Sequence, residues 1–282
     1  MNILITGANG QLGYEVIKSI RLKYENADIT AVDLDKLDIC DPAMVAFAVK
    51  GMDAVINCAA FTNVDLCETA SKEAFAVNCE GVKNLAQACI KENTTLIHIS
   101  TDYVFDGTKT TPYTEEDLTN PQSVYGKSKL AGEKEAEKCR KHFILRTSWL
   151  YGEKGKNFVK TMLNLGRTKE FVKVVNDQIG TPTLASDLAE VIVSLLGRTD
   201  YGTFHCTGNG SPVTWFEFTK EIFKLKGINT PVLPCTTEEF NAKAHRPSYS
   251  VLENRKLRQI GLDSMRDWKI ALKEFLDERN EL

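Results

Sequence analysis

Short apolar, β-rich runs alternate with helical stretches through the first half of the chain, and this alternation restricts the fold more than any other feature. Near-continuous apolar strands separated by helices are typical of a parallel sheet that is covered on both faces. Because crossovers between parallel strands have one hand, the pattern predicts an α/β fold with a Rossmann-type doubly wound parallel sheet. The expected strands are residues 2–6, 29–32, 54–57, 95–100 and 143–146, and the expected helices include 12–22, 43–49 and 72–90.

A glycine-rich turn follows the first expected strand and opens the first expected helix. Its sequence is Gly7-Ala-Asn-Gly10-Gln-Leu-Gly13, with the spacing G-x-x-G-x-x-G. Glycines allow the backbone to approach a pyrophosphate closely, and the helix amino terminus offers N–H groups and a positive dipole end. A plain strand-to-helix turn is the alternative explanation. The residues expected to contact a dinucleotide here are Gly7, Asn9, Gly10, Gln11, Leu12 and Gly13.

Asp33 ends the second expected strand, where a carboxylate can accept hydrogen bonds from the adenosine ribose hydroxyls. It would repel the extra phosphate of NADP, so it favours NAD, although use of NADP is left open. An ordinary loop aspartate is the alternative, because the surrounding segment is acidic. Residues expected to flank the adenine, or to end the third strand with small side chains near the cofactor, are Asp38, Ile39, Ala59 and Ala60.

The character of the chain changes after Trp149, where prolines divide it into shorter units. Helices are expected there over residues 186–196 and 215–225. We therefore expect an NAD(P)-binding Rossmann core over residues 1–150. Residues 151–282 are expected to form mainly a smaller α/β substrate-binding lobe, with some segments returning to the core.

Charge and composition exclude several classes of protein. The net charge of -3 and a pI near 5.9 give no basic footprint for nucleic acid. No apolar run is long enough to span a bilayer, and the amino terminus does not resemble a signal peptide. The eight cysteines and four histidines show no metal-like or redox-like spacing. We expect a reduced, cytoplasmic protein with no membrane or nucleic-acid partner and no assigned metal ligand.

Tyr125 and Lys129 begin a helical stretch at positions i and i+4, so they project from the same helix face. A phenol with a pKa of ~10 is a poor acid–base group at neutral pH, and we expect the Lys129 ammonium to lower that pKa. Lys129 can also donate to the nicotinamide ribose. Thr101 follows the fourth strand at the edge where open α/β sheets bind ligands, and its hydroxyl can bind a substrate carbonyl. A surface helix pair and a strand-end hydroxyl are the structural alternatives.

Several long strings resemble the extended short-chain dehydrogenase/reductase family, and within it the nucleotide-sugar reductase branch. The resemblance runs nearly end to end. These strings are far more specific than the glycines or the Tyr/Lys pair alone. They are Met1-Asn-Ile-Leu-Ile-Thr-Gly7, Ser100-Thr-Asp-Tyr-Val-Phe105, Val124-Tyr-Gly-Lys-Ser-Lys-Leu-Ala-Gly-Glu133, Arg146-Thr-Ser-Trp-Leu-Tyr151, Asn157-Phe-Val-Lys-Thr-Met-Leu163 and Asn176-Asp-Gln-Ile-Gly-Thr-Pro-Thr183.

The resemblance implies reduction, by NADH or NADPH, of the C4 ketone of a dTDP-linked 4-keto-6-deoxyhexose, namely dTDP-4-dehydro-L-rhamnose, to dTDP-L-rhamnose. It implies that Tyr125 donates the proton to the forming alkoxide, that Lys129 tunes Tyr125, and that Thr101 binds the carbonyl oxygen. Trp149 would lie against the sugar, with two further residues at the nucleotide diphosphate. The implied substrate contacts are Thr101, Asp102, Trp149, Asn157 and Arg246.

Three alternatives to this reaction are a nucleotide-sugar epimerase or dehydratase, a non-catalytic regulatory subunit, and a reductase of another 4-keto deoxysugar. A nucleotide-sugar epimerase uses the same Tyr/Lys pair but retains its NAD, whereas a dehydratase needs an Asp-Glu pair that does not follow Thr101 here. A non-catalytic regulatory subunit, such as the beta subunit of methionine adenosyltransferase, has no need of an intact Thr/Tyr/Lys set. Reduction of another 4-keto deoxysugar is the third.

Some members of the resembled family place glutamates and a divalent cation at a dimer contact. Glu15 and Glu190 are the positions considered for that role here. The carboxy-terminal match is too poor to assign a metal. Dependence on a divalent cation and assembly as a homodimer are therefore left open.

Overall fold

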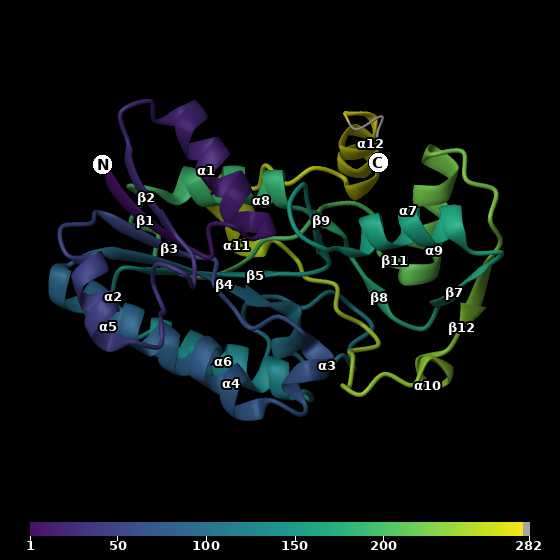
Figure 1. The fold of residues 1–282 in the computed structure, drawn as a ribbon, viewed down its shortest axis with the longest axis horizontal. Coiled ribbons are helices and arrows are strands. Elements are labelled where there is room, and N and C mark those ends of the chain that lie inside the picture. Colours follow the sequence, from purple (N-terminus) through teal and green to yellow (C-terminus); the bar gives the residue numbers. More distant parts are fainter. Residues whose placement is uncertain (279–282) are drawn as a thin grey trace.

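The computed structural model describes residues 1–278 of the chain. A six-stranded parallel sheet lies at its centre, with the strand order β10-β5-β4-β3-β1-β2 (Figure 1). This arrangement confirms the predicted Rossmann-type α/β class. The strands are β1 Asn2–Thr6, β2 Asp28–Val32, β3 Ala54–Asn57, β4 Thr95–Thr101, β5 His142–Thr147 and β10 Gly202–His205.

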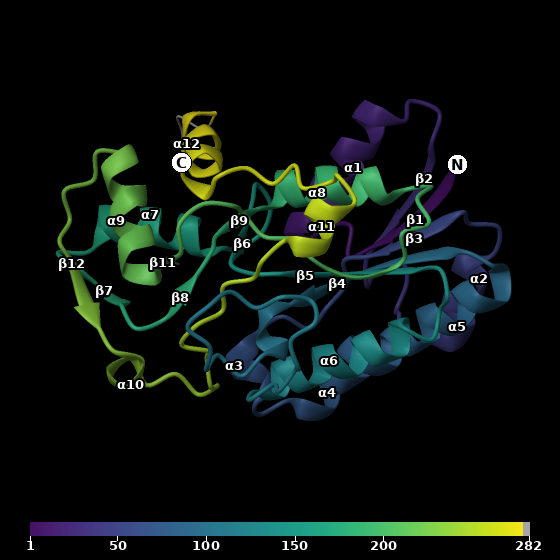
Figure 2. The same cartoon turned by 180° about the vertical axis from the view of Figure 1, so that it is seen from behind.

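Helices cover both faces of the sheet, as Figures 1 and 2 show. Side chains alternate along each strand, so Ile3 and Ile5 of β1 pack against one helical layer while Leu4 packs against the other. All three side chains are fully buried. The first layer contains α1 Gln11–Lys23 and α8 Ala185–Leu195, and the second contains α2 Pro42–Val49, α5 Val82–Glu92 and α6 Val124–Ala136.

A second group of elements lies to one side of the sheet and has its own apolar core (Figures 1 and 2). That core includes Tyr151, Phe218 and Trp268. Its main elements are α7 Phe158–Thr168, α9 Trp215–Leu225, α12 Trp268–Asp277 and the paired strands β7 Val172–Val175 and β12 Val232–Cys235. Smaller pairs join β6 Leu150–Tyr151 to β9 Thr183–Leu184, and β8 Ile179–Gly180 to β11 Val213–Thr214.

Three elements that follow residue 151 lie with the central sheet rather than with this second group. Strand β10 is an edge strand of the six-stranded sheet, and α8 packs beside α1. The short helix α11, Arg255–Gln259, contributes the buried Leu257 to the same core cluster. The chain therefore crosses between the two groups several times.

The helical segment predicted over residues 72–90 is divided. The structure has α4, Ser71–Phe75, then a π-helical turn, Ala76–Gly81, and then α5. Asn78 of the π-helical turn is buried, and its side chain exchanges hydrogen bonds with the backbone of Phe61 and donates to Ser128 Oγ. The π-helical turn directs the Asn78 side chain toward partners distant in sequence. Local sequence patterns do not specify such partners, so the turn was not predicted.

Helix α6 lies directly against the π-helical turn. A Cβ atom at Gly132 would lie 2.0 Å from the carbonyl oxygen of Asn78. Only glycine permits this distance, because no flexible side chain is available to move aside. The position of α6 on the sheet therefore depends on the absence of a side chain at residue 132.

We predict that Gly132→Ala destabilises the protein, although alanine gains ~1 kcal/mol over glycine in an isolated helix. Overpacking against backbone costs about 1–3 kcal/mol, and the contact here is with a rigid carbonyl. Urea unfolding should show a net loss of about 2 kcal/mol, while Lys134→Ala on the exposed face of α6 stays within ~0.5 kcal/mol. Unchanged or higher stability of Gly132→Ala would contradict this packing.

All eight cysteines are free thiols. Within residues 1–278, no helix is both long enough and apolar enough to cross a membrane.

Candidate active site

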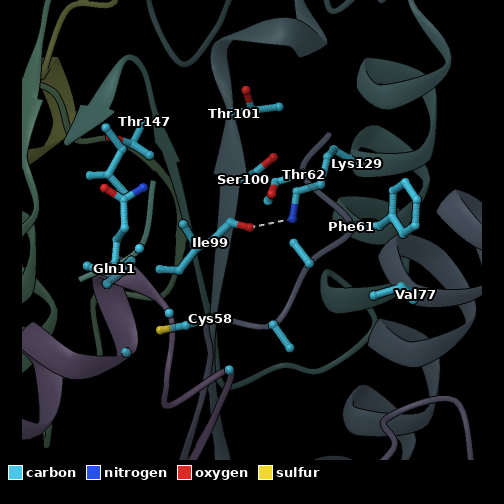
Figure 3. Close-up of a pocket in the computed structure, with 18 of the residues that line it drawn as sticks. Gln11, Cys58, Phe61, Thr62, Val77, Ile99, Ser100, Thr101, Lys129 and Thr147 are labelled. Carbon is cyan, nitrogen blue, oxygen red and sulfur yellow. Dashed lines mark hydrogen bonds between the residues drawn. The ribbon is translucent and has the colours of Figure 1, made fainter. Parts of the chain in front are cut away.

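A pocket of about 750 Å³ lies where β1, β3, β4 and β5 end. Figure 3 shows Gln11 on one side of it and Lys129 on the other, with Ile99, Ser100 and Thr101 between them. Two predicted site residues, Asn9 and Arg246, are not among its lining residues. The predicted residues that do line it are Gly7, Gly10, Gln11, Leu12, Gly13, Asp33, Asp38, Ile39, Ala59, Ala60, Thr101, Asp102, Tyr125, Lys129, Trp149 and Asn157.

The glycine turn leaves one end of this pocket open to an anion. Gly7 has φ +65°, and a Cβ atom there would lie 2.7 Å from the backbone nitrogen of Ala59. A Cβ atom at Gly13 would lie 2.3 Å from the Gly7 carbonyl oxygen. Helix α1 begins after Gly10 with no side-chain cap, so no side chain of its own competes for its first N–H groups. These features fit the pyrophosphate of a dinucleotide.

Asp33 organises the neighbouring turn. Its Oδ2 accepts a hydrogen bond from the Asn9 backbone N–H at 3.0 Å, and its Oδ1 accepts one from the Leu34 N–H at 2.8 Å. Each carboxylate oxygen retains a second lone pair for a ribose hydroxyl. Asn9 is exposed and lies outside the pocket lining, and it contributes through this backbone contact with Asp33.

Thr101 and Asp102 form a hydrogen-bonded pair at the end of β4, near Tyr125 of α6. Thr101 Oγ1 donates to Asp102 Oδ1 at 2.9 Å and accepts from the Tyr103 N–H at 3.2 Å. The side chain of Thr101 also lies near the Tyr125 phenol and lowers its pKa. A threonine hydroxyl has one proton, so Thr101 must break its hydrogen bond to Asp102 before it can donate to a ketone.

The prediction that the Lys129 ammonium lowers the pKa of Tyr125 is wrong. Burial raises the pKa of Tyr125 above its ordinary value, and the nearby Thr101 side chain only partly opposes this. Lys129 does not contribute to the shift, because its ammonium points to the strand rather than to the phenol. Tyr125 is therefore fully protonated at neutral pH and can act as a proton donor.

Lys129 is buried and reaches across the pocket floor (Figure 3). Its Nζ donates to the Ile99 carbonyl oxygen at 2.6 Å and lies 3.5 Å from His98 Nε2. Burial lowers the pKa of Lys129 to about 8, so most molecules carry a charged ammonium at pH 7. The lysine thus places a charge under the pocket while its stem remains in the core.

A row of buried polar groups continues from Lys129 along the strand ends. His98 Nδ1 lies 3.0 Å from Asn57 Nδ2, and Asn57 Oδ1 accepts from Thr6 Oγ1 at 2.7 Å. His98 was not predicted as a site residue, since a lone histidine in an apolar strand gives no sequence signal. The row connects β1, β3 and β4 to α6.

Trp149 and Asn157 line the far side of the pocket, and both are held by the protein. The Trp149 ring stacks on Trp215 with 3.4 Å between ring centroids. Asn157 caps α7 by accepting from the Lys160 N–H, and both of its amide hydrogens are donated, to Gln11 Oε1 and the Gly152 carbonyl. Asn157 therefore joins the starts of α7 and α1.

Arg246 forms a two-pronged ion pair with Asp65, with N···O distances of 3.0 and 2.9 Å. This pair holds the pKa of Asp65 below its ordinary value. Asp65 belongs to the short helix α3, Val64–Cys67, so the pair ties the loop of residue 246 to the core. Arg246 would have to exchange Asp65 for phosphate in order to bind a diphosphate.

A family model described as the RmlD substrate binding domain matches residues 1–281 of this chain. The chain belongs to that family. The spore coat polysaccharide biosynthesis protein SpsK of Bacillus subtilis strain 168 is 41% identical over 281 residues, which cover 99% of this chain and 98% of the relative. This result confirms the resemblance to nucleotide-sugar reductases inferred from the long sequence strings.

Two solved structures of dTDP-4-dehydrorhamnose reductases each superpose on this RmlD-family chain with a TM-score of 0.95. The one from Clostridium acetobutylicum ATCC 824 is 49% identical and covers 99% of both chains. The one from Bacillus anthracis strain Ames, described in complex with NADP, is 41% identical and covers 98% of this chain and 99% of its own.

The positions considered for a divalent cation lie in different surroundings. Glu15 is buried in α1, whereas Glu190 is exposed on α8. Within the part of the chain that the structure describes, no group of three or more His, Cys, Asp or Glu side chains is placed to hold a metal ion.

Asp102 gives a pH-dependent prediction. Burial raises its pKa to about 6, above the ~3.9 of an unfolded chain. Between these values the folded state binds more protons than the unfolded state, so this group lowers stability as pH rises through that window, by about 3 kcal/mol in all. In Asp102→Asn this contribution disappears. Urea unfolding of both proteins from about pH 4 to 7 should give diverging curves, and parallel curves would reject the assignment.

Proposed function

We propose that this protein reduces the C4 ketone of dTDP-4-dehydro-L-rhamnose to dTDP-L-rhamnose with NADH or NADPH. The observation that carries the proposal is the convergence of Thr101, Tyr125 and Lys129 in one pocket with the open glycine turn. The sequence identity of 49% and 41% between this chain and two dTDP-4-dehydrorhamnose reductases supports the choice of substrate. Because every cysteine is free, we expect the enzyme to act in a reducing compartment, the cytoplasm.

The residues of the pocket fit a nicotinamide dinucleotide. The glycine turn and the start of α1 would hold its pyrophosphate, Asp33 its adenosine ribose, and Lys129 its nicotinamide ribose. When bound in reduced form, the dinucleotide supplies the hydride. The Asp33 carboxylate favours NADH, whereas the relative from Bacillus anthracis was solved with NADP, so we propose that either cofactor serves.

Tyr125 is the proposed general acid. Its raised pKa keeps the phenol protonated, and the proton passes to the ketone oxygen as that oxygen gains negative charge. Thr101 contacts the same oxygen by exchanging its bond to Asp102. Trp149 borders the sugar, and Asn157 and Arg246 lie toward the nucleotide diphosphate. The part of residues 151–282 outside the central sheet forms the proposed substrate-binding lobe.

The first test is a cofactor-oxidation assay. The purified protein, given NADH or NADPH, should oxidise it in step with added dTDP-4-dehydro-L-rhamnose and form dTDP-L-rhamnose. The loss of reduced-nicotinamide absorbance measures the rate and ranks the two cofactors. If the cofactor remains bound and is not consumed, the proposal is wrong and the protein is instead an epimerase. The absence of both oxidation and bound cofactor would point to another keto sugar or a regulatory role.

Substitution of Tyr125 tests the mechanism. Tyr125→Phe should keep cofactor binding but lose about 10²–10⁴-fold in kcat, the usual contribution of general acid catalysis. Tyr201→Phe is the matched control, since Tyr201 packs on Phe143 away from the pocket and should keep normal turnover. Near-normal turnover of Tyr125→Phe would remove Tyr125 from the mechanism.

A further inference from the structure

Glu133 is a buried carboxylate on α6 that the proposed mechanism does not use. Tyr125, Lys129 and Glu133 are spaced four residues apart, so they follow one side of the helix. Glu133 is only 1% exposed. Its Oε1 accepts hydrogen bonds from Ser100 Oγ at 2.5 Å and from Arg146 Nε at 2.9 Å, and its Oε2 accepts from Arg146 Nη2 at 2.7 Å.

These bonds fasten α6 to two strands at once. Ser100 belongs to β4 and Arg146 to β5, and in the register of the sheet these two residues are partners. The Arg146 guanidinium also lies 5.2 Å above the ring of Phe105. A buried ion pair holds only in one geometry, because displacement of either charge leaves the other uncompensated. The pair therefore fixes how far α6 extends along the strand ends, and with it the positions of Tyr125 and Lys129.

Glu133 also supplies negative charge near Lys129, which raises the pKa of the lysine against the effect of burial. The other titratable groups that face Lys129 are His98 of β4 and Cys58 after β3. Burial raises the pKa of Cys58 to about 12, so this thiol is uncharged at neutral pH. Of these groups, Glu133 carries the compensating charge.

His98 does not supply an acceptor for the Lys129 ammonium, so the negative charge of Glu133 matters more. Its pKa is lowered well below the ordinary value by burial, so the ring is neutral. The Asn57 amide nitrogen is a donor, because Asn57 Oδ1 accepts the Ala59 N–H, and it faces His98 Nδ1. This hydrogen-bond network assigns the ring proton to Nε2, which faces Lys129 Nζ at 3.5 Å. The histidine therefore directs a donor, not an acceptor, toward the ammonium.

We propose that Glu133 is a positioning residue for the reductase. Held by Arg146 and Ser100, it fixes α6 against the strand ends and so places Lys129 where the lysine holds the cofactor. The inference rests on the proposed function only in assigning Lys129 to cofactor binding. It predicts that the carboxylate affects the pH dependence of cofactor binding as well as stability.

The test is cofactor affinity as a function of pH, measured without sugar by fluorescence titration with whichever of NADH and NADPH binds more tightly. In the wild type, affinity should fall as Lys129 loses its proton near pH 8. In Glu133→Gln this fall should begin about one pH unit lower, at the lower end of the effect of a neighbouring opposite charge. A binding midpoint equal to that of the wild type would overturn the proposal.

Two further variants keep the result interpretable. Glu133→Gln leaves Arg146 unpaired, so Glu133→Gln combined with Arg146→Gln removes both buried charges and should fold while keeping the lowered midpoint. Asp187→Asn is the control, because Asp187 is a buried partner of Arg266, 2.6 Å away, outside the pocket. It should lose stability but keep the wild-type midpoint. If the binding midpoint of Asp187→Asn shifts as much as that of Glu133→Gln, the shift reflects general destabilisation and the proposal is overturned.

Because this titration contains no sugar, it is independent of the substrate assignment. A protein that shows the shift but does not reduce dTDP-4-dehydro-L-rhamnose would support the role of Glu133 and reject the proposed reaction. A protein that reduces the sugar without the shift would do the reverse.

Discussion

The Glu133 carboxylate joins α6 to two strands whose ends border the pocket, to β5 through its ion pair with Arg146 and to β4 through its hydrogen bond from Ser100. Helix α6 carries the phenol and the ammonium of the candidate site, so their positions depend on how this helix sits on the sheet. Gly132 adds a steric constraint, since α6 lies against the Asn78 carbonyl with no room for a side chain. Polar attraction on one side and close backbone packing on the other define one position for the helix.

The opposite end of the pocket is built in another way. There the backbone itself forms the site, through the left-handed Gly7 and the uncapped start of α1. The two ends differ because they meet different demands. An anion is bound well by several N–H groups on a rigid turn, whereas a proton donor needs one hydroxyl held at a defined point. The six-stranded sheet keeps both ends in register.

The fold class could be predicted because apolar strands buried on both faces leave a continuous sequence pattern. The glycine turn could be located for a similar reason, since its position after β1 is a local property. The π-helical turn could not, because Asn78 finds its partners at Phe61 and Ser128, far away in sequence. The helix pattern alone therefore gave an uninterrupted segment.

The electrostatics of the site were the least accessible from sequence. The spacing of Tyr125 and Lys129 places them on one helix face, but it does not show that the ammonium turns to the Ile99 carbonyl. Burial, which sequence does not quantify, sets the direction of the Tyr125 pKa. The role of Glu133 could not be predicted from the sequence for a related reason. It directly precedes a charged stretch that resembles solvated helix surface, and its partner is on another element.

The stacked indoles of Trp149 and Trp215 have a spectroscopic consequence. The chain has three tryptophans, and two of them form this parallel pair, with an interplanar angle of 7° and one member in the pocket lining. Two chromophores at such a separation couple their electronic transitions, so the near-ultraviolet circular dichroism of the protein should be dominated by the pair. A molecule that enters beside Trp149 would alter that coupling, which gives the pocket an intrinsic optical label.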